Sequence, residues 1–139
     1  MRVEPFTVDS YVHALKRGAR GMSITNENSD RRRFLRLLFY MNDEFLDPNW
    51  SQVFFGSPTA KKNNGDIFPR LPEWPERKPL VKILCYCLMP NHFHLLLKEI
   101  KEGGVARFMQ KLGQSMTNHF NEKYQQKGSI FQGGYKGKT

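Results

Sequence analysis

The apolar positions of the chain change period several times, and each change predicts a different structural element. Residues 6–17 predict a first strand, which ends at Gly18 and a polar loop. From residue 34 to residue 45 the apolar side chains recur at helical spacing, after a polar cluster at residues 25–30 that offers several N-caps. The helical stripe consists of Phe34, Leu37, Leu38, Met41 and Phe45. The N-terminal third therefore predicts a strand followed by a helix.

A hairpin is predicted further along the chain. Residues 81–89 and 92–100 predict two strands joined through Pro90 and Asn91. We expect these strands to be antiparallel and to form the centre of the sheet. Pro90 cannot adopt the positive φ that a two-residue primed turn requires at its first central position, so we expect a longer or bulged loop.

A long amphipathic helix follows Gly103 and Gly104 and is expected to end at Gly128. Residues 129–131 then predict a short strand before a glycine-rich tail. The apolar stripe of this helix is Val105, Phe108, Met109, Leu112, Met116, Phe120 and Tyr124. The order strand, helix, hairpin, helix, strand predicts an α+β fold, a ferredoxin-like antiparallel sheet with two helices packed on one face.

Residues 46–80 interrupt these periods with repeated prolines and form an insertion. We expect residues 61–66 to be a mobile loop tip, since a loop this long is usually functional or disordered. The aromatic residues of the insertion predict packing over the core, with base stacking as the alternative. They are Trp50, Phe54, Phe55, Phe68 and Trp74. A chain of 139 residues fits one domain, so we assign residues 1–139 to a single unit.

The charge balance favours a polyanionic partner, first of all nucleic acid. Lys and Arg number 22 against 13 Asp and Glu, a net charge of +9. No apolar run approaches the roughly 20 residues of a spanning helix, and the N-terminus lacks the apolar core of a signal peptide. The spacing of Cys85 and Cys87 is too short for an ordinary disulfide, which favours a reducing compartment. We therefore expect a cytoplasmic protein without a membrane partner.

Basic and amide side chains after the first strand and in the C-terminal third are candidates for nucleic-acid contact, with a solvated basic surface as the alternative. These candidates are Lys16, Arg17, Arg20, Arg107, Lys111, Asn118, Lys123, Gln132, Lys136 and Lys138. The first helix also has a basic outer face, which is either solvated or in contact with phosphate. That face consists of Arg31, Arg32, Arg33 and Arg36.

His92 and His94 are the strongest chemical signal in the chain. Side chains alternate along a strand, so two imidazoles one residue apart point to the same side and are placed to hold one metal ion. Their apolar neighbours, Phe93, Leu95 and Leu97, are then expected to face the helices. Two ligands do not complete a site, which also needs a third side chain and an open position for a phosphate oxygen. A histidine pair without a ligand role is the alternative.

A structural zinc is a rival interpretation of the same region. Cys85 and Cys87 share one face of their strand, and in some registers that face also carries the two histidines. Ligands on two adjacent strands seldom converge into a tetrahedron, however, and small cysteines are common in cores. His13 and His119 look isolated and are expected to be ordinary structural residues.

These residues carry a resemblance to a known family. Met89–Leu97 resembles the signature of the HUH single-tyrosine transposases, in which U is a bulky apolar residue, here Phe93. Three other stretches are similar in the same order: Tyr11–Gly18 to the opening strand of the family, Arg32–Leu35 to its first helix and Gly128–Lys136 to the segment after its second helix. The insertion and the tail are similar to the branch related to REP-associated tyrosine transposases.

The resemblance implies a domain that binds single-stranded or hairpin DNA and cuts one strand through a phosphotyrosine intermediate. It implies that His92 and His94 are catalytic and hold a divalent metal, Mg²⁺ or Mn²⁺, against the scissile phosphate. Insertion-sequence members act as dimers and REP-associated relatives act alone, so both a homodimer and a monomer remain open.

The nucleophile does not carry over from the family. There the tyrosine lies on a later helix, beyond the segment that matches residues 131–136, and the third metal ligand follows one turn after it. This chain stops at Thr139, so we expect it to bind DNA without cleaving it. Tyr124 continues a buried stripe, and Tyr135 is expected to be structural or DNA-facing. The alternative from another class is a noncatalytic nucleic-acid-binding module of ferredoxin-like fold, a host-adopted transposase relative.

Overall fold

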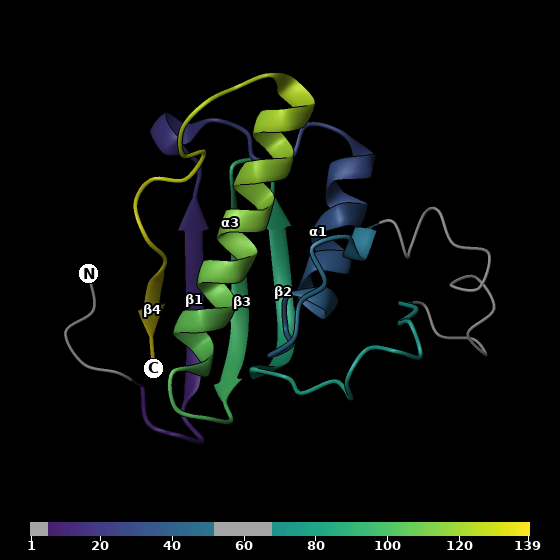
Figure 1. Ribbon diagram of the computed structural model, residues 1–139. Coiled ribbons are helices and arrows are strands. Elements are labelled where there is room, and N and C mark those ends of the chain that lie inside the picture. The colour runs from purple at the N-terminus through teal and green to yellow at the C-terminus, as the bar shows by residue number, and fades with distance from the viewer. Residues whose placement is uncertain (1–5, 52–67) are drawn as a thin grey trace.

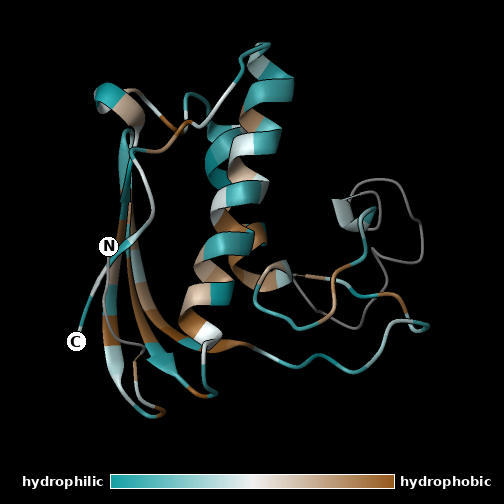
Figure 2. Ribbon diagram, turned by 60° about the vertical axis from the view of Figure 1, so that its left-hand side comes forward, coloured by the Kyte–Doolittle hydropathy of each residue, from teal (hydrophilic) through white to brown (hydrophobic). Residues whose placement is uncertain are grey.

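The computed structural model describes residues 6–51 and 68–139, and there it forms a four-stranded antiparallel sheet with both long helices on one face (Figure 1). The strand order is β2-β3-β1-β4. The predicted ferredoxin-like fold is confirmed. The elements are β1 (Tyr11–Arg17), η1 (Ala19–Gly21), α1 (Asn28–Tyr40), β2 (Val81–Met89), β3 (His92–Glu99), α3 (Gly104–Tyr124) and β4 (Lys136–Lys138). Seen edge-on, the sheet has no described helix on its other face (Figure 2).

β3 and β1 are the central strands of the sheet, and β2 is an edge strand. The prediction that the whole hairpin forms the centre is therefore wrong for β2. The crossover from β1 through α1 to β2 leaves a gap between these two strands, and β3 fills it. His94 consequently lies opposite Leu15 of β1 and opposite Cys87 of β2.

The hairpin connection is shorter than expected. Met89 pairs directly with His92, so Pro90 and Asn91 alone join the strands. Neither of them has a positive φ, so the turn avoids the primed geometry that proline forbids. The irregularity lies nearer the other end of β2, where the register shifts after Ile83.

The first strand begins later than predicted. Residues 7–10 form a turn in which Asp9 has a φ of 73°, and the ladder with β3 starts at Tyr11. Positive φ interrupts an extended chain, which explains why apolar content alone misplaced this boundary.

The final strand also lies elsewhere than predicted. Residues 129–131 contribute one isolated bridge in the described chain, from Phe131 to Gly18 at the end of β1. Gly133 then has a φ of 67°, which breaks the extended conformation before β4 pairs with β1.

The helix α1 starts within the predicted cap cluster, where Glu27 and Asp30 form a capping box. It ends at Tyr40 rather than at Phe45. The buried side chain of Asn42 explains this end, because its Oδ1 accepts two backbone N–H groups at the start of β2, at 2.8 and 2.9 Å.

The helix α3 carries its predicted apolar stripe, which is buried from Val105 to Phe120. The helix ends at Tyr124, earlier than the predicted stop at Gly128. Gln125 takes the left-handed cap conformation instead, with a φ of 53°.

The described aromatic residues of the insertion pack on the core, as predicted. Trp50 is buried, and Phe68 and Trp74 are partly buried against the core. Tyr40 of α1 stacks on Trp50 and donates its hydroxyl to the carbonyl of Pro69 at 2.6 Å. Phe54, Phe55 and the loop tip at residues 61–66 lie outside the described residues.

Candidate functional site

The two histidines of β3 lie on the face of the sheet that the helices leave uncovered. Phe93, Leu95 and Leu97 are each at most 1% exposed, and they alternate with half-buried positions along the strand. His92 and His94 occupy two of those positions, as the strand periodicity predicted. We call this uncovered side of the sheet the histidine face.

Each of these histidines has its Nδ1 atom in a hydrogen bond. Nδ1 of His92 lies 2.8 Å from Oδ1 of Asn91, and Nδ1 of His94 lies 2.8 Å from Nε2 of His13. An amide oxygen only accepts, so Nδ1 of His92 carries a proton, and in the neutral ring Nε2 then keeps a lone pair. The same arrangement follows for His94 when its Nδ1 donates to His13. Ligating histidines in metalloproteins show this pattern of bonding.

His13 is not isolated, so the expectation made for it is wrong. Its ring stacks on that of His94 with the centroids 5.0 Å apart, and His92 lies edge-on to His94 at the same centroid distance. No local pattern predicts this contact, because it depends on the register of β1 against β3, where His13 pairs with Leu96, two residues from His94. Three imidazoles therefore gather on the histidine face.

The pKa of His94 is lowered from its ordinary value. Burial is the main cause, and the neighbouring His13, His92 and Arg17 add to it. A lowered pKa keeps the imidazole neutral at neutral pH, which is the form that binds metal ions.

A complete metal site is not assembled in the described part of the chain, where no three His, Cys, Asp or Glu side chains are grouped to hold an ion. The strand register does place Cys87 opposite His94 and Cys85 opposite Leu96. Both cysteines are free and exposed, and they do not join the histidines in such a group.

The structure divides the predicted nucleic-acid-binding residues between two sides of the sheet. Arg17 pairs with His92, and Lys136 and Lys138 pair with Leu15 and His13, so these cations share the histidine face. Lys82 and Lys98, which pair with each other, lie on the same face and were missed. Arg20 in η1 and Gln132 in the tail are exposed.

The remaining candidates lie on the helix side. Lys123 pairs with Glu27 and Asp30 at 2.9 and 2.8 Å. Arg107 and Lys111 of α3 donate to the backbone carbonyls of residues 44 and 43. These cations bind other parts of the chain. Lys16 and Asn118 line a groove beside α3.

Tyr124 also lies on the helix side, away from the histidines. Its hydroxyl donates to Asp30 at 2.5 Å. Burial and this hydrogen bond raise the pKa of Tyr124 to about 12, so the hydroxyl stays protonated at neutral pH. His119 lies 3.6 Å from Asp30 and is likewise not isolated, contrary to expectation.

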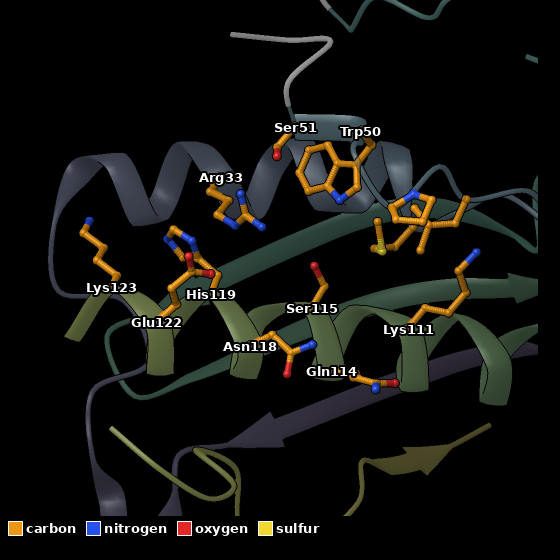
Figure 3. Close-up of a pocket in the computed structure, with 13 residues that line it drawn as sticks. Arg33, Trp50, Ser51, Lys111, Gln114, Ser115, Asn118, His119, Glu122 and Lys123 are labelled. Carbon is orange, nitrogen blue, oxygen red and sulfur yellow. The ribbon is translucent and has the colours of Figure 1, made fainter. Parts of the chain in front are cut away.

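A cavity of about 800 Å³ opens between α1 and α3 (Figure 3). Arg33, Lys111, His119 and Glu122 are among its lining residues, whereas neither histidine of β3 is. The cavity and the histidine face are therefore separate features, on opposite sides of the sheet.

The fold and the histidine pair on an uncovered sheet face define an α+β domain with a candidate metal-binding surface. Residues 73–139, which include β2, β3, α3 and β4, match the family model described as "Transposase IS200 like". Over this segment the chain is similar to the IS200-like transposases. No curated protein and no solved structure matches it.

Within residues 6–51 and 68–139, no helix has both the length and the apolar character needed to cross a bilayer.

Proposed function

We propose that this chain is a DNA-binding transposase domain whose histidine face holds a divalent metal, Mg²⁺ or Mn²⁺, at Nε2 of His92 and His94. The supporting observation is the hydrogen bonding of both Nδ1 atoms, which leaves Nε2 of each ring for a ligand. Such a metal polarises a scissile phosphate and offsets its developing negative charge. The reaction class is cleavage and rejoining of one DNA strand through a phosphotyrosine.

The charges on the histidine face suit a single DNA strand. Arg17, Lys136 and Lys138 surround the histidines, and no strand position on this face carries Asp or Glu. Within residues 6–51 and 68–139 these three cations have no carboxylate in an ion pair, so they are available to neutralise phosphates along a strand. His13 positions His94 through their hydrogen bond and does not touch the DNA in this proposal.

In this proposal residues 1–139 bind DNA but do not cleave it. Tyr124 is held by Asp30 on the helix side, and Tyr135 lines the groove beside α3 on that side. Neither hydroxyl therefore faces a phosphate bound at the histidines. Incubation with labelled hairpin DNA and Mn²⁺ should give no covalent adduct. An adduct that disappears in Tyr124→Phe would contradict this assignment.

Metal binding is tested with Mn²⁺ by isothermal titration or by electron paramagnetic resonance. His92→Ala and His94→Ala should each abolish binding, whereas the control His119→Ala, on the helix side, should leave it unchanged. Mn²⁺ binding that survives both β3 variants would refute the site. Single-stranded DNA binding in a protein that binds no Mn²⁺ would instead support the noncatalytic nucleic-acid-binding module.

A further inference from the structure

Lys16 is a half-buried cation on the side of β1 opposite to the histidine face. It pairs with the buried Phe93 and thus points toward α3. Its Nζ lies 4.4 Å from the centroid of the Phe131 ring, and no ion pair or hydrogen bond to it is found within residues 6–51 and 68–139. Burial lowers its pKa. An ammonium group in this position lacks the carboxylate that usually accompanies a buried charge.

Gly113 of α3 provides the space for this ammonium group. A Cβ atom at that position would lie 2.7 Å from Nζ of Lys16, closer than real Cβ contacts come. Glycine in the middle of a helix is less favourable than alanine. The glycine therefore leaves room beside α3 for the end of the Lys16 side chain, which has no acidic partner within residues 6–51 and 68–139.

The ammonium borders a groove of about 380 Å³ between α3 and the C-terminal tail. The wall contributed by α3 is rich in amides and hydroxyls, which can contact the edge of a base. These side chains are Gln110, Gln114, Thr117 and Asn118. Ser129 and Tyr135 form the wall contributed by the tail. The volume lies within the range of small-ligand sites.

We propose that this groove binds one nucleotide of the DNA, with its phosphate against the ammonium of Lys16 and its base edge against the amides of α3. The inference rests on the proposed DNA-binding function and adds a contact on the other side of the sheet. Lys16 and Arg17 are consecutive, so β1 presents one cation to each side.

The test is an NMR titration of ¹⁵N-labelled protein with the four 2′-deoxynucleoside 5′-monophosphates and with inorganic phosphate, in buffer containing EDTA. Saturable shifts should map to Gly113 and to the side-chain amides of Gln114 and Asn118. Lys16→Met, which keeps the aliphatic stem, should abolish them. Gly113→Ala, which displaces Nζ without changing charge, should weaken binding at least tenfold. The control Lys127→Met removes an exposed charge outside the groove and should change nothing.

The NMR spectrum of each variant also reports whether that variant is folded. If Lys16→Met does not fold, the result with Gly113→Ala decides whether the groove binds the nucleotide. Shifts that persist in both variants, or shifts confined to the histidine face, would overturn the groove. If single-stranded DNA still binds in that case, and binding depends on Arg17, the proposed DNA-binding function stands and only the groove is refuted. If the unmodified chain does not bind single-stranded DNA, the proposed function itself is refuted.

Discussion

At the scale of single residues, the hydrogen bonds of the imidazoles determine what the histidine face can bind. The bond from His92 to Asn91 fixes the tautomer of one ring, and the contact of His94 with His13 orients the other. Groups that bond to ligating histidines raise their basicity and hold their orientation. His13 should therefore contribute to metal affinity without being a ligand.

His13→Phe tests this role because it keeps a ring of similar size but removes Nε2. We expect Mn²⁺ affinity to fall by about 10- to 100-fold, the usual cost of losing such a partner, whereas His94→Ala abolishes binding. Calorimetric titration with Mn²⁺ measures both effects. An unchanged affinity in His13→Phe would show that the 2.8 Å contact does not support the site.

Sequence periodicity predicted which side chains of β3 face the uncovered side, because alternation is a local property of any strand. It could not predict that His13 joins them, since that contact depends on pairing between residues 81 positions apart. The dependence on distant residues also explains why β2 was predicted at the centre of the sheet and why the last strand was predicted at residues 129–131 instead of Lys136–Lys138. Strand order and register are set by long-range contacts that no local pattern records.

At the scale of elements, Asp30 joins the start of α1 to the end of α3. Its carboxylate accepts hydrogen bonds from Lys123, from Tyr124 and from the backbone N–H groups of Asn26 and Glu27. Burial alone raises the pKa of Asp30, but these hydrogen bonds outweigh it and hold the pKa well below its usual range. The two helices are therefore linked through a carboxylate that stays charged.

Asp30→Asn should consequently destabilise the fold in a pH-dependent way. A lowered folded-state pKa stabilises the protein above the unfolded-state pKa of about 3.9, and this contribution is lost as pH falls toward the folded-state pKa. We expect a loss of about 1–3 kcal/mol at neutral pH that shrinks below about pH 4. Urea unfolding at several pH values measures it, and a difference that does not change with pH would contradict the assignment.

At the scale of the whole molecule, the net charge of +9 is spread over surfaces with different roles. Lys136 and Lys138 on the histidine face lie opposite Leu15 and His13, whereas Lys98 on that face pairs with Asp9 and Lys123 on the helix side pairs with two carboxylates. Composition indicated the polyanionic partner but not this division. The division depends on which basic side chains find acceptors in the folded chain.

Replacing Arg17, Lys136 and Lys138 together by Gln should weaken single-stranded DNA binding and flatten its dependence on salt. Each lost phosphate contact lowers the slope of log affinity against log salt by about 0.7, so we expect a change of about 2. Fluorescence anisotropy over about 50–300 mM salt measures the slope. The charge-matched control replaces Arg31, Arg32 and Lys127 by Gln. Equal changes in both variants would mean that only net charge matters.

The alternation of side chains along β1 restricts which insertions and deletions this strand can tolerate. Its even-numbered positions build the interior and end at Lys16, and its odd-numbered positions carry His13 and Arg17 outward. Inserting or deleting one amino acid between His13 and Lys16 would exchange the two sets, sending a guanidinium toward the core and the lysine to the opposite surface. Substitution can alter the residues there one at a time, but the length of this strand is not free to vary.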